Sequence, residues 1–204
     1  KATNYALKDM TREEFIKAVT TGLNAPPSYF PINARINKQG SESLDDVFEK
    51  GLHPLTVEQF KQKISEEVWV LDTRPENIFT QGFVPGSISI GLNGRFAEWA
   101  GTILPYNQPL VLVTDPGKEK ETITRLARVG IDNVQGYLDG GMNTFFATNE
   151  TYDKIMTFTG NECTALLEIE NYDLLDVRNR LEVARHRMTG SVHVPLNLLS
   201  SMAG

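Results

Sequence analysis

Residues 111–121 have the sequence VLVTDPGKEKE, in which three aliphatic residues lead into a Thr-Asp-Pro-Gly turn and a run of charges. This order predicts a buried strand that opens into a helix. In an α/β protein, functional groups commonly lie at such a junction, at the carboxyl end of a strand. The junction here offers Asp115 and no cysteine, serine or histidine. The residue type at position 115 therefore decides which chemistry this turn can carry.

Strand and helix patterns alternate on both sides of this stretch. A capping box at Thr56–Gln59 predicts the start of a helix. Strands are predicted at 68–73, 87–90, 109–114 and 133–138, and helices at 94–104, at 118–129 and after Gly140-Gly141. This alternation predicts an α/β fold with a central parallel sheet covered on both faces.

The chain also contains an internal repeat. Residues 68–90, VWVLDTRPENIFTQGFVPGSISI, match residues 172–194, YDLLDVRNRLEVARHRMTGSVHV, without a gap and at a constant offset of 104 positions. The residues shared by the two copies are Leu71/Leu175, Asp72/Asp176, Arg74/Arg178, Gly86/Gly190 and Ser87/Ser191. We predict a complete first copy at 53–160. Residues 161–204 cover less than half of the repeat length, and we expect them to be the first part of a second copy.

Composition limits the class of protein. The 204 residues are 40% hydrophobic and 23% charged, as in soluble globular proteins. A formal net charge of −6 argues against nucleic acid or an anionic membrane as a partner. No apolar run approaches the roughly 18–20 residues of a membrane span. The single cysteine, Cys163, excludes an internal disulfide and favours a reducing, cytoplasmic location.

Residues 1–52 lie outside the repeat. A capping box at Thr11–Glu14 predicts a helix that carries Phe15. Residues 41–46, SESLDD, are predicted to form a surface connection. We predict that this segment is the tail of a preceding domain, docked by Phe15, Tyr29 and Phe30.

The complete copy resembles the rhodanese-homology family. The matching motifs are the strand end Asp72-Thr73-Arg74, the turn Gly82-Phe83-Val84-Pro85-Gly86-Ser87, the strand 109–114, and Leu138-Asp139-Gly140-Gly141. The resemblance covers about 54–150 and again 161–204. It implies a rhodanese-like three-layer domain.

In that family a six-residue loop, Cys-x-x-Gly-x-Arg, follows the strand, and its cysteine carries the transferred sulfur as a persulfide. Backbone N–H groups of the loop and the helix N-terminus stabilise the thiolate. The corresponding residues here are Asp115, Pro116, Gly117, Lys118, Glu119 and Lys120. Aspartate cannot carry a persulfide, the glycine comes one place early, and Lys120 replaces the arginine. The resemblance therefore implies an inactive copy without a catalytic residue, in which Asp115 caps the helix and Pro116 is its first residue.

The pairs Asp72/Arg74 and Asp176/Arg178 are interpreted as structural ties at strand ends. Gly86 belongs to the same structural motif of the family, as does its counterpart Gly190. This interpretation follows from the resemblance, since copies with and without activity keep these residues.

For the histidines, the cysteine and the charged residues 118–121, structural roles are expected. His53 is expected to pack or cap at the start of the domain, and Cys163 to be a buried or incidental thiol, the alternative being a persulfide relay. His186 and His193 do not suffice for a metal site. The charged residues 118–121 are expected on a solvated helix face, the alternative being a contact of Lys118 and Lys120 with a partner domain.

The first residues, KATNYALKDMTREEFIKAVTTGL and PPSYFPINARINK, are similar to the closing segment of metallo-β-lactamase-fold persulfide dioxygenases. In some bacterial members that domain continues into two rhodanese units. The resemblance implies a parent enzyme of sulfide detoxification that oxidises a low-molecular-weight persulfide at a mononuclear non-haem iron. Its iron ligands would lie upstream, since no His-x-His-x-Asp-His motif occurs here. A sulfur-carrying cysteine of the second copy would lie 104 residues after Asp115, near position 219.

This fragment itself is predicted to hold no metal or cofactor and to act as a structural docking domain. Its expected partners are the upstream dioxygenase domain, the downstream rhodanese domain, and further copies of the chain. The parent would use a persulfide or thiosulfate.

Two alternatives remain open. The chain could be the inactive first half of a tandem-rhodanese thiosulfate sulfurtransferase, which leaves residues 1–52 unexplained. It could instead be a rhodanese-like scaffold module without enzymatic activity. An iron motif upstream distinguishes the dioxygenase from the tandem sulfurtransferase, and a cysteine downstream distinguishes both from the scaffold.

Overall fold

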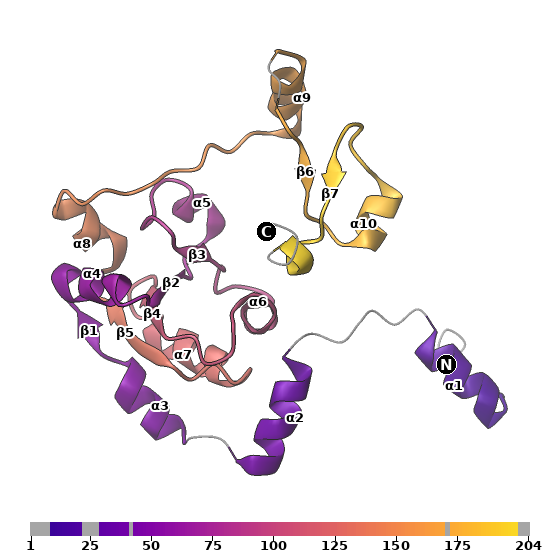
Figure 1. Cartoon of the computed structure of the whole chain (residues 1–204), viewed down its shortest axis with the longest axis horizontal. Helices are drawn as coiled ribbons and strands as arrows, with labels where there is room; N and C mark the ends of the chain where they lie inside the picture. The colour runs from indigo at the N-terminus through magenta and orange to yellow at the C-terminus, as the bar shows by residue number, and fades with distance from the viewer. Residues whose placement is uncertain (1–8, 22–28, 41–42, 170–171, 200–204) are drawn as a thin grey trace.

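A computed structural model describes residues 9–21, 29–40, 43–169 and 172–199 (Figure 1). The strands are β1 (Pro54–Leu55), β2 (Trp69–Asp72), β3 (Ile88–Ser89), β4 (Leu110–Val113), β5 (Val134–Leu138), β6 (Leu175–Asp176) and β7 (Val192–His193). The helices are α1 (Arg12–Thr20), α2 (Phe30–Gln39), α3 (Leu44–Gly51), α4 (Val57–Ser65), α5 (Glu76–Phe79), α6 (Phe96–Ile103), α7 (Glu119–Ala127), α8 (Gly141–Ala147), α9 (Gly160–Ile169), α10 (Arg180–Arg185) and a 3-10 turn at Leu196–Leu198.

Five parallel strands form the central sheet, in the order β1-β5-β4-β2-β3. Trp69 pairs with Leu110 and Asp72 with Val113, so β2 and β4 end at the same level. The turns that follow these two strands therefore meet at one edge of the sheet. The predicted α/β fold with a central parallel sheet is confirmed.

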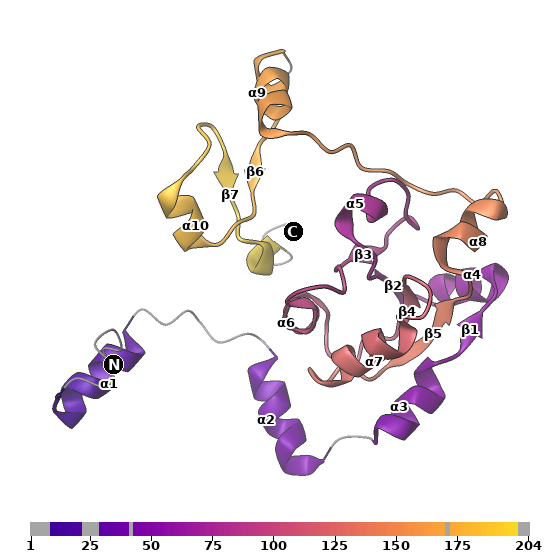
Figure 2. The ribbon, with the colours of Figure 1, turned by 180° about the vertical axis from the view of Figure 1, so that it is seen from behind.

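The two faces of the sheet pack against different helices. Leu110 and Leu112 of β4 lie in a hydrophobic cluster with side chains of α3, α6 and α7. The alternate residues Val111 and Val113 lie in a second cluster with α4 and α8 (Figure 2). All four are fully buried, as in a parallel strand that is covered on both sides.

The edge strand β1 approaches β5 closely because of a glycine. Gly136 has φ 130°, and a Cβ atom there would lie 2.8 Å from the carbonyl oxygen of His53. The same His53 carbonyl accepts the backbone N–H of Tyr137 at 2.9 Å. The two-residue strand β1 was not predicted.

The prediction of a surface connection at 41–46 was wrong from Ser43 onward, and residues 41 and 42 lie outside the described residues. Ser43 is the N-cap of α3, and its hydroxyl accepts the Asp46 amide at 3.1 Å. Val47 is buried against β5 and α7. The polar residues thus start a helix that covers the sheet, ahead of the predicted boundary at His53. The domain boundaries themselves remain predictions.

The docking of the N-terminal segment was predicted correctly only at Tyr29. Its ring lies against α6, where a Cβ atom at Gly101 would come within 2.7 Å of it. Phe30 contacts the Tyr29 ring edge-on but is 52% exposed. In α1, which the structure describes throughout, no residue is buried, and Phe15 is 41% exposed. The expectation that Phe15 docks the segment was therefore wrong.

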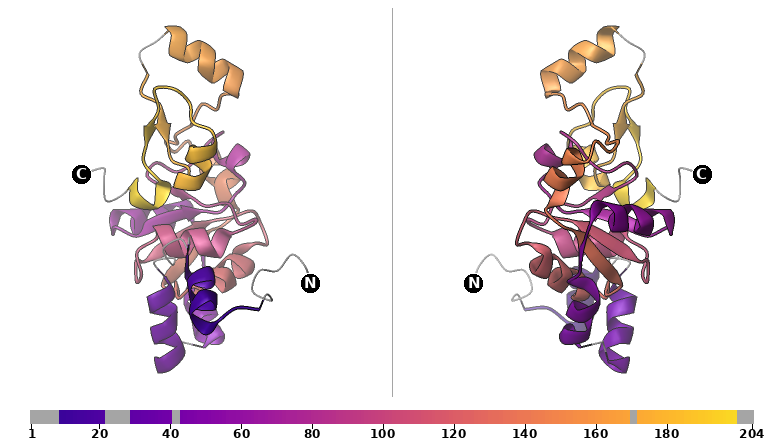
Figure 3. Two further views of the ribbon diagram at one scale, coloured as in Figure 1. Left: turned by 90° about the vertical axis from the view of Figure 1, so that its right-hand side faces the viewer. Right: turned by 90° about the vertical axis from the view of Figure 1, so that its left-hand side faces the viewer.

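A second, two-stranded parallel sheet lies near the C-terminus. Strand β6, helix α10 and strand β7 follow one another as β2, α5 and β3 do, and β6 pairs with β7 in the matching register. In the side views this unit stands at the opposite end of the molecule from α2 and α3 (Figure 3). Leu175 is 46% exposed, whereas its counterpart Leu71 is fully buried. The repeat is therefore present in the structure as well as in the sequence, and the apolar residues of the second copy are more exposed.

Candidate functional site

The candidate site is the turn that follows β4 at the carboxyl edge of the sheet. Buried Thr114 comes directly after the strand, and Asp115 opens the turn. The Asp115 carbonyl oxygen accepts the Lys118 amide at 3.0 Å. Gly117 has φ 82°, a left-handed conformation that favours glycine. Helix α7 begins at Glu119.

The prediction that Asp115 caps α7 was wrong. The N-cap residue is Lys118, and the Asp115 side chain is exposed to solvent. Pro116 lies in the turn and not at the first helical position. The reason is the left-handed Gly117, which interrupts the right-handed backbone that a helix starting at Pro116 would require.

A different carboxylate occupies the turn. Glu119 Oε1 accepts the backbone N–H of Gly117 at 3.1 Å and lies 3.4 Å from the Thr114 hydroxyl. The Glu119 side chain thus folds back over the turn from the first residue of α7. The sequence placed Glu119 in the degenerate loop but did not reveal this role.

The lysines of the turn point elsewhere. Lys118 forms an ion pair with Glu121 at 2.9 Å, and its hydrogen bond lowers the pKa of the Glu121 carboxyl. Lys120 lies 4.9 Å from the ring centre of Phe48 in α3, a cation–π distance. The charged stretch 118–121 is therefore only in part a solvated face.

Next to this turn, the end of β2 holds a buried ion pair. Arg74 Nε donates to both oxygens of Asp72 at 2.9 and 3.0 Å, and Arg74 Nη2 donates to Oδ2 at 2.6 Å. Nη2 also donates to the Gly82 carbonyl oxygen at 2.9 Å. The two side chains are 0% and 6% exposed. The pair therefore ties the end of β2 to the segment that leads into β3.

The second copy repeats this pair near the surface. Arg178 donates to Asp176 at 2.9 and 2.6 Å and to the carbonyl oxygen of His186, the counterpart of Gly82, at 2.7 Å. Hydrogen bonding to Arg178 lowers the pKa of Asp176 to about 2. Gly86 and Gly190 have φ angles of 77° and 83°, so the turns before β3 and β7 also match.

The remaining candidate residues do not come together. His53 is exposed, and Cys163 lies half-buried in α9. His193 Nε2 lies 2.8 Å from the Arg178 carbonyl oxygen, while His186 contributes its own carbonyl. Within the described ranges, no group of three or more His, Cys, Asp or Glu side chains could hold a metal ion.

The fold and these motifs agree with a comparison to known families. The sequence profile described as "Rhodanese-like domain" matches residues 56–148. Residues 56–148 form a rhodanese-like domain. The match spans β2, β4 and the turn after β4, so Asp115 lies inside the rhodanese-like domain. A search of curated proteins found no significant match.

Solved structures share the fold. A metallo-beta-lactamase from Staphylococcus aureus subsp. aureus COL superimposes with a TM-score of 0.54 at 23% identity, over 68% of this chain and 38% of that one. This chain therefore spans well under half of that protein's length, and the likeness concerns the fold.

Two further matches have lower scores. The rhodanese-like domain of the Anabaena sp. Alr3790 protein gives a TM-score of 0.44 at 14% identity, covering 62% of this chain and 94% of that domain. A thiosulfate sulfurtransferase from Pseudomonas aeruginosa gives 0.43 at 18% identity, covering 71% of this chain and 31% of the other.

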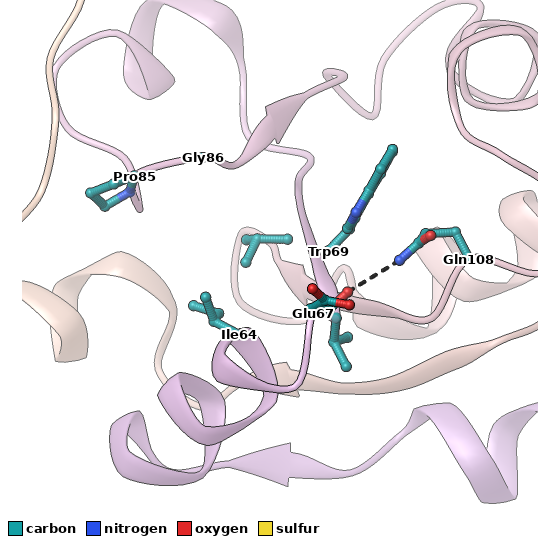
Figure 4. A pocket seen from close by; sticks show the side chains of 8 residues that line it. Ile64, Glu67, Trp69, Pro85, Gly86 and Gln108 are labelled. Carbon is teal, nitrogen blue, oxygen red and sulfur yellow. Dashed lines mark hydrogen bonds between the residues drawn. The ribbon is translucent and has the colours of Figure 1, made fainter.

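The opposite edge of the sheet has a hollow of about 500 Å³. Figure 4 shows Trp69 between Pro85 on one side and Gln108 on the other, with the Gln108 amide donating to the Glu67 carbonyl at 3.3 Å. Among the residues that line this hollow, Glu67 is the one with an ionisable side chain.

The turn after β4 presents two carboxylates, the exposed one of Asp115 and the half-buried one of Glu119. None of the helices in the described ranges has the length and hydrophobicity of a membrane span. The sequence predicted a turn between the strand and the helix, and the structure has this turn between β4 and α7. The sequence missed the position of Glu119, for which the acidic first turn of α7 was the available signal.

Proposed function

We propose that the rhodanese-like domain is a docking domain without sulfur-transfer activity in a larger persulfide dioxygenase and sulfurtransferase. Asp115 carries this proposal, because it occupies the end of β4 where the reaction needs a sulfur nucleophile. A carboxylate cannot accept a sulfane sulfur and release it again. In this proposal the domain keeps the fold and positions its neighbours.

Three observations support the larger enzyme. Residues 1–52 resemble the end of metallo-β-lactamase-fold dioxygenases. This fold also occurs within a longer chain, the metallo-beta-lactamase from Staphylococcus aureus, of which the match covers 38%. The second copy leaves Leu175 and Met188 exposed, whereas their counterparts Leu71 and Val84 are buried, which supports further packing partners for that copy.

The iron of such an enzyme would be held outside this segment. The described residues offer no suitable ligand group, so none of their side chains is assigned a role in persulfide oxidation. Their part is to bind and orient neighbouring domains.

A sulfur-transfer assay with this chain tests the inactive domain. We expect no thiocyanate above the blank when thiosulfate and cyanide are supplied. A Cys163→Ser variant is the control, because Cys163 is the one cysteine in the sequence. Turnover that survives this substitution would contradict the proposal, and turnover that it abolishes would move sulfur transfer to α9.

Oxygen uptake by the natural full-length protein with glutathione persulfide tests the parent activity. Uptake is the expected result. Thiosulfate:cyanide turnover without oxygen uptake would favour a tandem sulfurtransferase instead, and the absence of both would favour a scaffold.

A further inference from the structure

The carboxylate of Glu119 already occupies the hydrogen-bond donors of the turn after β4. Glu119 Oε1 takes the Gly117 N–H at 3.1 Å and lies 3.4 Å from the hydroxyl of Thr114. Thr114 is buried, and Glu119 is half-buried. These two donors are the ones that an oxyanion entering the turn would use.

The turn offers this carboxylate little compensating charge. Lys118 is paired with Glu121, and Lys120 lies over the Phe48 ring. Behind the turn, partial burial and the charges of Glu119 and Asp139 raise the pKa of the Tyr137 hydroxyl. Neither lysine of the turn is paired with the Glu119 carboxylate in these contacts.

We propose that Glu119 closes this turn to thiosulfate and similar oxyanions, as a second barrier independent of the missing cysteine. A dianion entering the turn would meet a like charge, and it would find the Gly117 N–H and the Thr114 hydroxyl already engaged. Restoring a thiol at position 115 would then not suffice for sulfur transfer. The inference rests on the proposed absence of transfer activity in the natural domain.

The reaction to be restored transfers one sulfur atom from thiosulfate to cyanide. A thiolate at position 115 attacks the outer sulfur of thiosulfate, the sulfur–sulfur bond breaks, and sulfite leaves with the electron pair. Cyanide then removes the outer sulfur of the persulfide as thiocyanate, and the thiolate returns. Sulfite and thiocyanate form in equal amounts.

The test compares variants of the full chain in a Cys163→Ser background. Asp115→Cys alone is expected to stay near the blank. Asp115→Cys with Glu119→Ala is expected to raise kcat/KM for thiosulfate by roughly 10²-fold, the effect that one freed oxyanion donor commonly has. Glu119→Gln, which keeps an acceptor oxygen but loses the charge, is expected to give an intermediate gain.

Glu121→Ala is the matched control, because Glu121 lies on the same helix and pairs outward with Lys118. Because it also frees Lys118, it is expected to raise the activity of the Asp115→Cys variant far less than Glu119→Ala does. The pH dependence of iodoacetamide alkylation gives a second readout. The pKa of the thiol at position 115 is expected to fall when Glu119 is removed, while nearby Lys118, Tyr137 and Asp139 remain.

Two results would overturn the proposal. One is an Asp115→Cys variant that is already as active as the double variants. The other is a set of folded double variants, with unchanged thermal midpoints, that stay at the blank. Sulfur transfer by the unaltered chain would instead contradict the proposed function and leave the effect of Glu119 on the introduced thiol measurable.

Discussion

The substitution Arg74→Met tests how strongly the buried ion pair at the end of β2 stabilises the rhodanese-like domain. It removes the contacts at 2.9, 3.0 and 2.6 Å to Asp72 and the hydrogen bond at 2.9 Å to the Gly82 carbonyl. The Asp72 carboxylate is 0% exposed. In the variant it would retain one hydrogen bond, from the backbone N–H of residue 74, which is 3.0 Å long in the unaltered protein. Removing one member of a buried pair costs about 3–5 kcal/mol. The total free energy of unfolding of a typical domain is about 5–15 kcal/mol, so this loss is a large part of it.

Urea unfolding followed by tryptophan fluorescence measures this loss. Both tryptophans of the chain, Trp69 in β2 and Trp99 in α6, lie in the rhodanese-like domain. With a urea dependence of about 2 kcal/mol per molar, the midpoint is expected to fall by about 2 M. A fall of less than about 0.5 M would refute the reasoning from burial.

Arg178→Met is the control, because the pair in the second copy has the same geometry but its arginine is 44% exposed. Water can replace the lost partner there. Hydrogen exchange at the Val192 and Val194 amides, which bond to carbonyls of Leu174 and Asp176, is expected to change little. Equal damage in the two copies would mean that burial is not the cause.

A double substitution distinguishes the loss of the whole ion pair from the loss of one of its two charges. Asp72→Leu with Arg74→Met replaces two buried charges by apolar side chains, which often restores stability. The double variant is expected to be more stable than Arg74→Met alone. A double variant that is less stable would show that the Asp72 carboxylate still stabilises the domain without Arg74, through its hydrogen bond to the backbone N–H of residue 74.

Three further substitutions and one titration follow from the geometry. Thr56→Ala removes the hydroxyl that accepts the Gln59 amide at the start of α4 and is expected to cost about 1 kcal/mol in urea unfolding. Asp115→Ala is expected to change the free energy of unfolding by less than about 0.5 kcal/mol, since the exposed Asp115 does not cap α7. Gly136→Ala is expected to cost roughly 1–3 kcal/mol, because it combines φ 130° with a contact of 2.8 Å to a backbone oxygen. In a carboxyl NMR titration Asp176 is expected to have a midpoint near pH 2, and Arg178→Met should return it toward the ordinary 3.8. Since the folded pKa is the lower one, the pair stabilises above about pH 3.8 and loses this effect as the pH falls through about 2.

The strands β2, β4 and β5 were predictable because each leaves a local signal. Apolar runs mark buried strands, and in β4 the four residues alternate between two hydrophobic clusters. The capping box at Thr56 marks the start of α4 from side-chain chemistry alone. Such signals depend on residues close in sequence, so a single chain suffices to detect them.

Elements β1 and α5, with two and four residues, are too short to show a period. Helix α3 was hidden because its cap, Ser43, and its acidic first turn have the composition of a linker. Its burial depends on Val47 meeting β5 and α7, a contact between residues far apart in the chain. Tertiary packing therefore decides what local polarity leaves ambiguous.

The start of α7 shows the same limit at the site. Asp115 followed by Pro116 has the composition of a cap and a first helical residue, yet the helix begins at Glu119. The left-handed Gly117 moves the start, and the freed amide then takes the Glu119 carboxylate. Because of this one backbone angle, the side chain of Glu119, and not that of Asp115, accepts a backbone N–H of the turn.

Position 115 can change without cost to the fold because it lies just outside the core. Leu110 to Val113 and Thr114 are buried and carry the packing of β4, whereas Asp115 is exposed. The ion pair of Asp72 and Arg74 fixes the neighbouring strand end independently of that residue. The structure of the domain and its reaction therefore depend on different side chains. In the proposed function the domain lacks the nucleophile and has Glu119 in the turn, while the buried strands and the ion pair keep the fold.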